Sequence, residues 1–307
     1  MHRVRAYFFV CAGFLSLAAA LLPSSAGAQP PAYLTQWGMD VGSCAYSVAI
    51  DGSGKVYVAN GCPGFIEVYT TSGTYLTEIG TPGQGGDGQL ANPAGVAVDA
   101  GGNVYVADTY SHRIQVFASD GTFIRKWGSY GVGNGQFDQP GGVAVDAGGN
   151  VYVADSGNNR IQVFTNSGTY LTQWGLTGFP VGVTVDATGN VYVGGPYDIR
   201  KFTGDGTLLA QRGTGAFGVA VDGSGNVYAS DGYNDRVEKL TSNLTYVTEW
   251  GSSGEGDGQF YRPWGVAVDA SGNVYVADQG NHRIQVFGSL PVPAQSTSWG
   301  RVKALYR

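Results

Sequence analysis

Short runs of apolar residues recur along most of this chain, and clusters of Gly, Asn, Asp and Ser separate them. The stretch at residues 95–117, GVAVDAGGNVYVADTYSHRIQVF, contains three such runs and two polar turns. Runs of this length that are rich in Val, Ile, Tyr and Phe predict β-strands, and D-A-G-G-N predicts a tight turn because Gly permits positive φ. A fourth run with aromatic residues, such as TFIRKW, follows a further turn. Each copy of the pattern therefore predicts four antiparallel strands.

The pattern occurs six times. Close copies occupy residues 142–164 and 265–287, and weaker copies begin at Ser47, Gly182 and Gly218. The first valines of the copies lie 36 to 48 residues apart: Val48, Val96, Val143, Val183, Val219 and Val266. Repeats of about 40–50 residues are typical of β-propeller blades. The sequence therefore predicts an all-β chain folded as a six-bladed β-propeller.

The second and third strands of each copy are apolar on both faces. Burial of both faces is expected for sheets that stack radially against neighbouring sheets. One tyrosine recurs at the same position of the second strand, and we interpret it as packing between blades: Tyr57, Tyr105, Tyr152, Tyr192, Tyr228 and Tyr275.

The two ends of the repeat region complement each other. Residues 33–37, YLTQW, match the fourth-strand pattern but precede the first copy, whereas the last copy ends after its third strand, at Phe287. We therefore predict that the N-terminal strand completes the last blade, which closes the ring and removes an open sheet edge. The predicted propeller spans residues 29–288.

Residues 1–28 are interpreted as a signal peptide. Arg3 and Arg5 precede an apolar run, and Ala26-Gly27-Ala28 forms a cleavage site. The run is short and ends at Pro23, which disfavours a membrane anchor, and no second run in the mature chain is long enough to span a membrane. We expect an exported bacterial protein, extracellular, periplasmic or on the cell surface, and monomeric.

Residues 289–307 consist of a Pro/Ser/Thr linker and a short basic tail, which is either a frayed end or a sorting signal.

Charge restricts the partners of the chain. Loss of the leader changes the net charge from −6 to −8, and leaving out the three cations of the tail gives −11 for the propeller. This acidic balance argues against nucleic acid as a partner, because affinity for phosphates comes largely from Lys and Arg.

Two cysteines remain in the mature chain, Cys44 and Cys62. The hairpin around the first D-G-S-G turn places Cys44 opposite Gly61 or Cys62. In an oxidising compartment we predict a disulfide bond between the two, with free thiols as the alternative. Two cysteines without a nearby His do not make a metal site.

The motif G-V-A-V-D-x-x-G-N-V-Y-V-A-D-x-x-x-x-R-I-Q-V-F, with G-D-G-Q-F-Y-R-P before it at residues 256–263, resembles the NHL repeat family. The resemblance covers residues 33–288 and is strongest in the second, third and sixth copies. It implies a six-bladed propeller that serves mostly as a binding platform for proteins, peptides, glycans or RNA. A minority of such propellers are lyases with a metal at the channel mouth, so a metal-assisted lyase or lactonase is the alternative function.

An Asp/Arg pair flanks the turn between the second and third strands in four copies. Phe65 and Asp198 replace the Arg in copies 1 and 4, and Gly195 replaces the Asp in copy 4. Because a pair repeated at one turn fixes that turn or bridges blades, we interpret the pairs as structural: Asp108 with Arg113, Asp155 with Arg160, Asp231 with Arg236, and Asp278 with Arg283.

The mature chain offers little for catalysis. Its two histidines, His112 and His282, occupy equivalent positions of copies 2 and 6. A zinc site of the lyase kind needs about three converging ligands, which two histidines do not supply, and no G-x-S-x-G motif stands out. We therefore favour a binding module over an enzyme and predict no cofactor, although Asp and Asn oxygens leave Ca²⁺ open.

A ligand site is predicted where the inner strands begin. The connections between blades lie on the same face as the turns between second and third strands, and variable loops on a rigid frame are common binding sites. Two positions before the first Val, three blades that are neighbours in a closed ring carry aromatic residues: Phe217, Trp264 and Tyr46. We predict an aromatic-walled pocket there for a protein, peptide or glycan; the alternative is that the aromatic residues plug the channel. Tyrosines of the neighbouring turns are expected to extend the pocket: Tyr110, Tyr197 and Tyr233.

Overall fold

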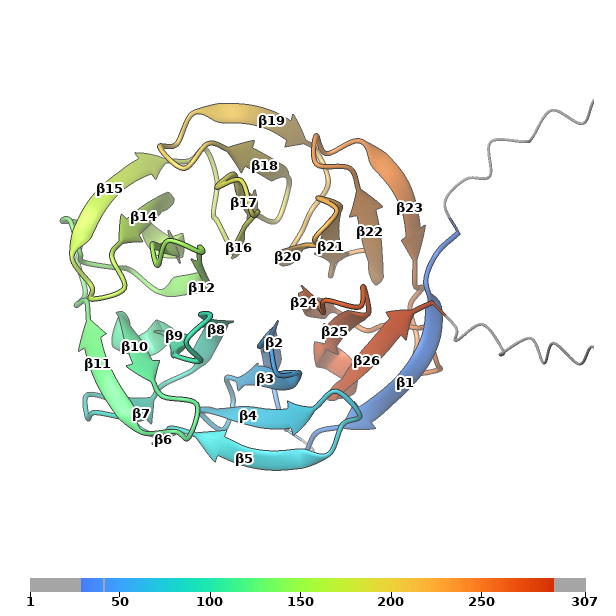
Figure 1. The fold of residues 1–307 in the computed structure, drawn as a ribbon, viewed down its shortest axis with the longest axis horizontal. Coiled ribbons are helices and arrows are strands. Elements are labelled where there is room, and N and C mark those ends of the chain that lie inside the picture. The colour runs from blue at the N-terminus through green and yellow to red at the C-terminus, as the bar shows by residue number, and fades with distance from the viewer. Residues whose placement is uncertain (1–28, 41, 290–307) are drawn as a thin grey trace, which may run out of the picture.

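The computed structural model describes residues 29–40 and 42–289. Six four-stranded antiparallel sheets surround a central axis as the blades of a propeller (Figure 1). The expected all-β, six-bladed fold is therefore confirmed. The predicted signal peptide and the basic tail lie outside the described residues. Within the described part of the chain, no helix is long and apolar enough to cross a membrane.

In blades 1 to 5 the strands follow one another in chain order from the inner to the outer edge, and in blade 6 the outer strand is β1. Blades 1 to 3 consist of β2 (Ala45–Ile50), β3 (Lys55–Asn60), β4 (Phe65–Thr70) and β5 (Tyr75–Ile79); β8 (Pro93–Val98), β9 (Val104–Asp108), β10 (Arg113–Phe117) and β11 (Phe123–Trp127); and β12 (Pro140–Val145), β13 (Val151–Asp155), β14 (Arg160–Phe164) and β15 (Tyr170–Gly175). Blades 4 to 6 consist of β16 (Gly182–Val185), β17 (Val191–Gly194), β18 (Ile199–Phe202) and β19 (Leu208–Arg212); β20 (Gly218–Val221), β21 (Val227–Asp231), β22 (Arg236–Leu240) and β23 (Tyr246–Trp250); and β24 (Pro263–Val268), β25 (Val274–Asp278), β26 (Arg283–Gly288) and β1 (Ala32–Gly38).

Short elements connect the blades and their strands. β6 (Thr81–Pro82) and β7 (Gln89–Leu90) pair within the connection from blade 1 to blade 2. Three 3-10 turns join second and third strands: η1 (Thr109–Ser111), η2 (Ser156–Asn158) and η3 (Gln279–Asn281).

The N-terminal strand closes the ring. β1 pairs with β26, with Trp37 opposite Ile284 and Gly38 opposite Arg283, and the blue and red ends of the chain meet in this blade (Figure 1). The predicted completion of blade 6 is confirmed. All six blades therefore have four strands, and no blade lacks its outer edge.

The D-x-x-G-N turns are fixed by their aspartates. The Asp99 carboxylate accepts the backbone N–H groups of Gly101 at 2.9 Å and Asn103 at 2.8 Å, and the Tyr105 hydroxyl donates to it at 3.0 Å. Burial is the main cause that raises the pKa of Tyr105 to about 12, and the charge of Asp99 and this hydrogen bond add to it. The repeated tyrosine thus links the turn to the interface between blades.

Neighbouring blades bury apolar side chains against each other. Val96 and Val104 of blade 2 pack with Tyr57 of blade 1, and the other interfaces repeat this arrangement. On the outer edge, the Trp37 ring lies 5.8 Å from Tyr69 of the next blade. The equivalent pairs are Trp127 with Phe164, Trp174 with Phe202, and Trp250 with Phe287. These contacts account for strands that are apolar on both faces.

The predicted disulfide bond is present between Cys44 and Cys62, whose Cα atoms lie 5.2 Å apart. Ala45 faces Asn60 in the register of β2 and β3, so the two cysteines continue the hairpin beyond its last pair. The bond fastens the chain where it enters blade 1.

Candidate ligand site at the channel mouth

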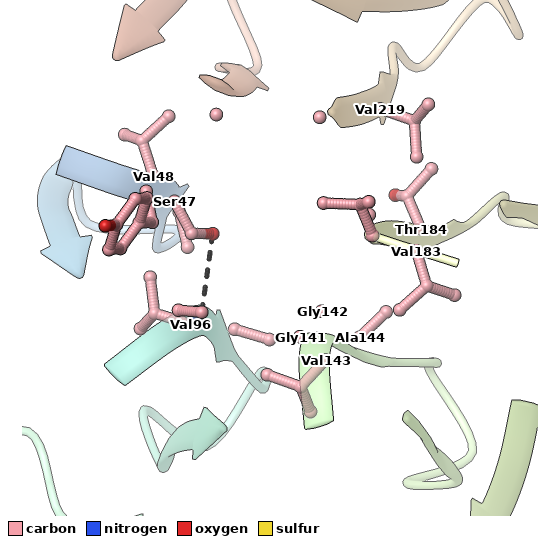
Figure 2. Close-up of a pocket in the computed structure, with 18 of the residues that line it drawn as sticks. Ser47, Val48, Val96, Gly141, Gly142, Val143, Ala144, Val183, Thr184 and Val219 are labelled. Atoms are coloured by element: carbon pink, nitrogen blue, oxygen red, sulfur yellow. Dashed lines mark hydrogen bonds between the residues drawn. The ribbon is translucent and has the colours of Figure 1, made fainter. Parts of the chain in front are cut away.

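Six inner strands surround a channel of about 480 Å³. Most lining residues come from β2, β8, β12, β16, β20 and β24, and a few come from the neighbouring turns and connections. Figure 2 shows part of the lining arranged around the open axis. Each inner strand begins opposite the end of the second strand, as Pro93 does opposite Asp108. One end of the channel therefore opens among the connections between blades and the turns after the second strands, and we call this end the mouth.

A ring of glycines lets the inner strands approach closely. A Cβ on Gly142 would lie 2.7 Å from the carbonyl oxygen of Val181 in the next blade, and a Cβ on Gly218 would lie 2.5 Å from that of Trp264. A Cβ on Gly95, Gly182 or Gly265 would likewise lie 2.4 to 2.7 Å from a backbone atom of the next blade. Blade 1 carries Ser47 instead, whose hydroxyl oxygen accepts the N–H of Val96 at 3.4 Å (Figure 2). The Gly of each GVAVD segment is thus explained by contact between blades.

Irregular pairing turns the side chains at the mouth. The register shifts between Ala45 and Ser47 in blade 1 and between Pro263 and Val266 in blade 6. A β-bulge leaves one residue unpaired and redirects its side chain. The unpaired segments contain Tyr46 and Trp264, which are the residues that the sequence singled out.

Four aromatic rings form a continuous belt across blades 5, 6 and 1. Phe217 stacks on Trp264 at 4.4 Å with an angle of 13°, and Tyr46 meets Trp264 edge-on at 5.1 Å. Tyr233 lies 4.9 Å from Phe217 and extends the belt onto the turn of blade 5. Phe217 is only 7% exposed, whereas Tyr46 and Trp264 are half-buried.

Glycines in the neighbouring turns make room for this belt. A Cβ on Gly61 would collide with the Tyr46 ring, and a Cβ on Gly232 would collide with the Phe217 ring. Blades 2 and 3 have no aromatic residue at the mouth position, and they carry Thr109 and Ser156 in place of these glycines. The turns of blades 1 and 5 are therefore adapted to the aromatic side chains that they support.

The opposite half of the mouth is lined by small and amide side chains. Ala94, Gly141 and Val181 stand where the belt has aromatic rings. Tyr110 lines this side and is 54% exposed. Three further lining residues were not identified from the sequence: Asn92, Gln139 and Phe179. All three directly precede a proline, which begins the inner strand in blades 2 and 3 and lies two residues before it in blade 4. This spacing is the signal that would have revealed them.

Tyr197 lies apart from the channel. It lines a separate hollow of about 80 Å³ together with Pro196, Pro180 and Arg200. Phe179 borders both this hollow and the channel. The six predicted ligand-site residues are therefore divided: five belong to the mouth or its belt, and Tyr197 belongs to the hollow beside it.

The lining of the channel carries no charged side chain. It contains no Asp, Glu, Lys, Arg or His, and among residues 29–40 and 42–289 no three His, Cys, Asp or Glu side chains are grouped to hold a metal. The residues present at this mouth therefore do not fit a metal of the lyase kind.

The two histidines join neighbouring blades. His112 Nδ1 accepts the N–H of Gln139 at 3.1 Å, and His282 Nδ1 lies 2.6 Å from the carbonyl oxygen of Ser43. Neither histidine lines the channel. In each case the ring ties a turn to the connection that enters the next blade.

Each Asp/Arg pair of blades 2, 3 and 6 clamps a long connection. Arg113 Nε donates to Asp108 at 2.7 Å, while its Nη atoms donate to the carbonyl oxygens of Gly85 at 3.1 Å, Gly86 at 2.8 Å and Gln89 at 2.8 Å. Asp108 also accepts the N–H of Ala91 at 2.7 Å. Arg160 and Arg283 repeat these contacts with Asp155 and Asp278. The pairs thus hold the connections 24 to 28 residues upstream of the arginine.

The clamp also explains why the repeats diverge. Blades 1 and 4 follow short connections and carry Phe65 and Asp198 at the Arg position. In blade 5, which also follows a short connection, Arg236 pairs with Asp231 at 3.3 Å and with Glu238 and Glu249 at 2.7 Å. Where no long connection has to be held, the Asp/Arg pair is lost or takes other partners.

Comparisons with known proteins identify the repeat and the fold. The NHL repeat family model matches residues 90–117, 137–164 and 260–287, which include the Asp/Arg pairs of blades 2, 3 and 6. No curated protein matches the chain. A streptogramin B lyase structure is 16% identical with a TM-score of 0.60, covering 85% of this chain and 88% of its own. Selenomethionine-substituted virginiamycin B lyase from Staphylococcus aureus is 14% identical with a TM-score of 0.62, covering 83% and 99%.

A third solved structure is a catalytically inactive histidine-to-alanine variant of virginiamycin B lyase from Staphylococcus aureus with quinupristin. It is 16% identical with a TM-score of 0.59, covering 86% of this chain and 89% of its own. At these identities the likeness shows a shared fold and does not carry the activity of those enzymes. Three segments of the chain match the NHL repeat model, and the chain folds as a six-bladed β-propeller.

Proposed function

We propose that this protein is an exported binding or scaffold module that holds a protein, peptide or glycan ligand at the mouth of its channel. The observation that carries the proposal is the mouth itself, which combines a belt of four aromatic rings with an open, uncharged channel. Concave sites that are mostly apolar with a few polar groups are the usual form of ligand sites.

The frame around the mouth supports this role. Three long connections on the same face are clamped by buried arginines, so a ligand meets a preorganised surface and little entropy is lost on binding. Export is supported by the Cys44–Cys62 bond together with the leader, because disulfides persist in oxidising compartments. The propeller's net charge of −11 supports a partner other than nucleic acid.

The residues at the mouth give little support to the alternative function, a metal-assisted lyase. The solved structures with a similar fold are lyases, and a histidine-to-alanine variant of one of them is catalytically inactive. In this chain His112 and His282 are engaged in contacts between blades, and the lining offers no carboxylate as a base or a metal ligand. A binding role therefore uses the residues that are present.

The proposal is tested by screening the mature protein against peptide and neutral glycan arrays and measuring affinity for any ligand that is retained. Tyr110→Ala is expected to weaken binding about tenfold, as loss of an interface tyrosine commonly costs more than 1 kcal/mol. The matched control is Tyr75→Ala, because Tyr75 on outer strand β5 is 53% exposed and Tyr110 is 54% exposed.

Trp264→Ala distinguishes a belt that binds a ligand from a belt that only fills the channel. If the belt serves a ligand, this variant loses affinity by more than its loss of thermal stability explains. Unchanged affinity in both Tyr110→Ala and Trp264→Ala, or no retained ligand on either array, would contradict the proposal.

A further inference from the structure

The channel and the small hollow are neighbouring cavities that share one wall. Phe179 lines both, and it is 45% exposed. The channel has a volume of about 480 Å³ and the hollow about 80 Å³. A ligand that occupies both cavities must therefore pass over the Phe179 ring and place a larger group on one side and a smaller group on the other.

The hollow exists because blade 4 follows a short connection. In blades 2, 3 and 6 the long connection buries an apolar side chain: Leu90, Phe137 and Phe260, each no more than 1% exposed. Residues 176–181 lead into blade 4 without such a side chain, and Leu176, Pro180, Pro196 and Tyr197 line the space. The hollow is therefore a place for one small apolar side chain.

Charge at the hollow is already neutralised within the chain. Arg200 Nε donates to Asp198 at 2.9 Å, and Gln211 donates to the same carboxylate oxygen at 2.7 Å. Arg200 also donates to the carbonyl oxygen of Thr177. Because the channel lining is uncharged as well, the group bound at either cavity is expected to be neutral.

The polar groups at the mouth match a peptide main chain. The side-chain amides of Asn92 and Gln139 form no hydrogen bond with other residues of the described ranges, and each amide offers a donor and an acceptor, as a peptide group does. Both residues adopt positive φ, 53° and 48°, immediately before a proline. Two uncharged amides therefore line the opening of the channel, Gln139 on the side of blade 3 and Asn92 beside the Tyr46 end of the aromatic belt.

The aromatic belt favours a peptide over a glycan. One face of Trp264 is covered by Phe217 in a parallel stack, and Tyr46 approaches the same ring edge-on. Sugar rings bind aromatic side chains by stacking on an open face, whereas apolar side chains also pack against ring edges. The belt therefore offers packing for an apolar side chain and little stacking surface for a sugar.

We propose that the mouth binds an extended, uncharged polypeptide segment, with one bulky apolar side chain in the channel and a small apolar side chain two residues away in the hollow beyond Phe179. In an extended chain, residues i and i+2 point to the same side, and peptide-binding domains commonly provide separate pockets for such alternate side chains. The main chain between them lies across Phe179, and the neighbouring peptide groups are expected to pair with the Gln139 amide at the opening. This inference rests on the proposed function, since it names the ligand of the same mouth.

The test uses defined probes on the mature, disulfide-bonded protein. Fluorescent nine-residue Gly/Ser peptides carry one Phe and one Val, spaced i,i+1 or i,i+2, and neutral hexasaccharides of glucose and N-acetylglucosamine serve as glycan probes. The i,i+2 peptide is expected to bind about 10- to 100-fold more tightly than the i,i+1 peptide, which corresponds to burial of one additional valine side chain. Fluorescence anisotropy and calorimetry measure the affinities.

Variants assign the effect to the two cavities. Phe179→Ala is expected to abolish the preference for i,i+2 spacing, and Gln139→Ala to weaken all peptides about threefold to tenfold, the range of a hydrogen bond. Leu171→Ala is the control, because Leu171 on outer strand β15 is 47% exposed, close to the 45% of Phe179. Thermal denaturation of each variant checks that the propeller is folded.

The outcomes distinguish this inference from the proposed function. Binding of a hexasaccharide that Tyr110→Ala weakens, with no peptide bound, would leave the proposed function standing and overturn the peptide assignment. Peptides that bind without a spacing preference, or with a preference that survives Phe179→Ala, would overturn the two-cavity arrangement. If neither class binds, both are overturned.

Discussion

Replacing Gly142 by Ala tests the close approach of blades 3 and 4. The added Cβ would lie 2.7 Å from the carbonyl oxygen of Val181, 2.9 Å from the backbone nitrogen of Val183 and 3.2 Å from the Cα of Gly182. All three neighbours are backbone atoms of the next inner strand, so no side chain can turn aside to relieve the contact. Only a displacement of the two blades relieves it.

The expected magnitude follows from overpacking. An extra methyl group forced into a well-packed site commonly costs about 1–3 kcal/mol. For a domain of this size each 1 kcal/mol lowers the melting temperature by about 2–4 °C, so Gly142→Ala should melt about 2–12 °C below the parent protein. Circular dichroism during heating, and urea unfolding monitored by tryptophan fluorescence, give the two values.

Gly175→Ala provides the matched control. Gly175 is the last residue of β15, its added Cβ would meet nothing within 4 Å, and its φ is not positive. The same chemical change there should leave stability unchanged or raise it slightly, by about 0.4–1 kcal/mol, through lower entropy of the unfolded chain. If Gly142→Ala melts within 1 °C of Gly175→Ala, the glycines do not permit the approach of the blades and the reasoning is wrong.

Three further predictions concern the clamp, the disulfide bond and pH. Arg160→Ala leaves a buried carboxylate and three loop carbonyls without their partner, so stability should fall by about 3–5 kcal/mol, and residues 128–139 should exchange their amide hydrogens faster; unchanged exchange there would contradict the clamp. Reduction of the bond between Cys44 and Cys62, 18 residues apart, should lower stability by about 3 kcal/mol in urea unfolding, and an equal midpoint before and after reduction would count against this. Burial and the neighbouring aspartates raise the pKa of Tyr105 and Tyr152 to about 12; the stability they contribute is full below pH about 10, the ordinary tyrosine value, and is lost as pH rises through about 12. Titration of these tyrosines at pH about 10 in the folded protein would refute the last prediction.

Features that depend on the order of residues along strands were accessible from the sequence. The fourth-strand pattern of residues 33–37 predicted closure of the ring, and the register of the first hairpin predicted the bond at Cys44. Both follow from alternation of side chains in paired strands, which is written directly in the residue order.

Features that depend on backbone acceptors or on two separate blades were less accessible. The repeated Asp/Arg pair was visible, but the carbonyl groups that Arg113 holds leave no mark in the sequence, because every residue has a carbonyl. The arc of Tyr46, Phe217 and Trp264 was predicted from ring order, whereas the parallel stack that covers one Trp264 face depends on the exact approach of two blades. The hollow beside Phe179 exists because the short connection lacks the buried apolar side chain of the long connections. This absence is recognised only by comparing the connections of the other blades in the structure.

The pairing of β1 with β26 has a consequence for biosynthesis. Strand β1 is the first part of the propeller to leave the ribosome, and its partner is the last; Gln36 and the arginine that holds it are separated by 247 residues. The nascent chain must keep the earliest strand unpaired until the final one has emerged, and contacts so distant in sequence form slowly. A circular permutant that starts at β16 and joins residue 288 to residue 32 would make these strands consecutive, and it should refold faster than the natural order of the chain.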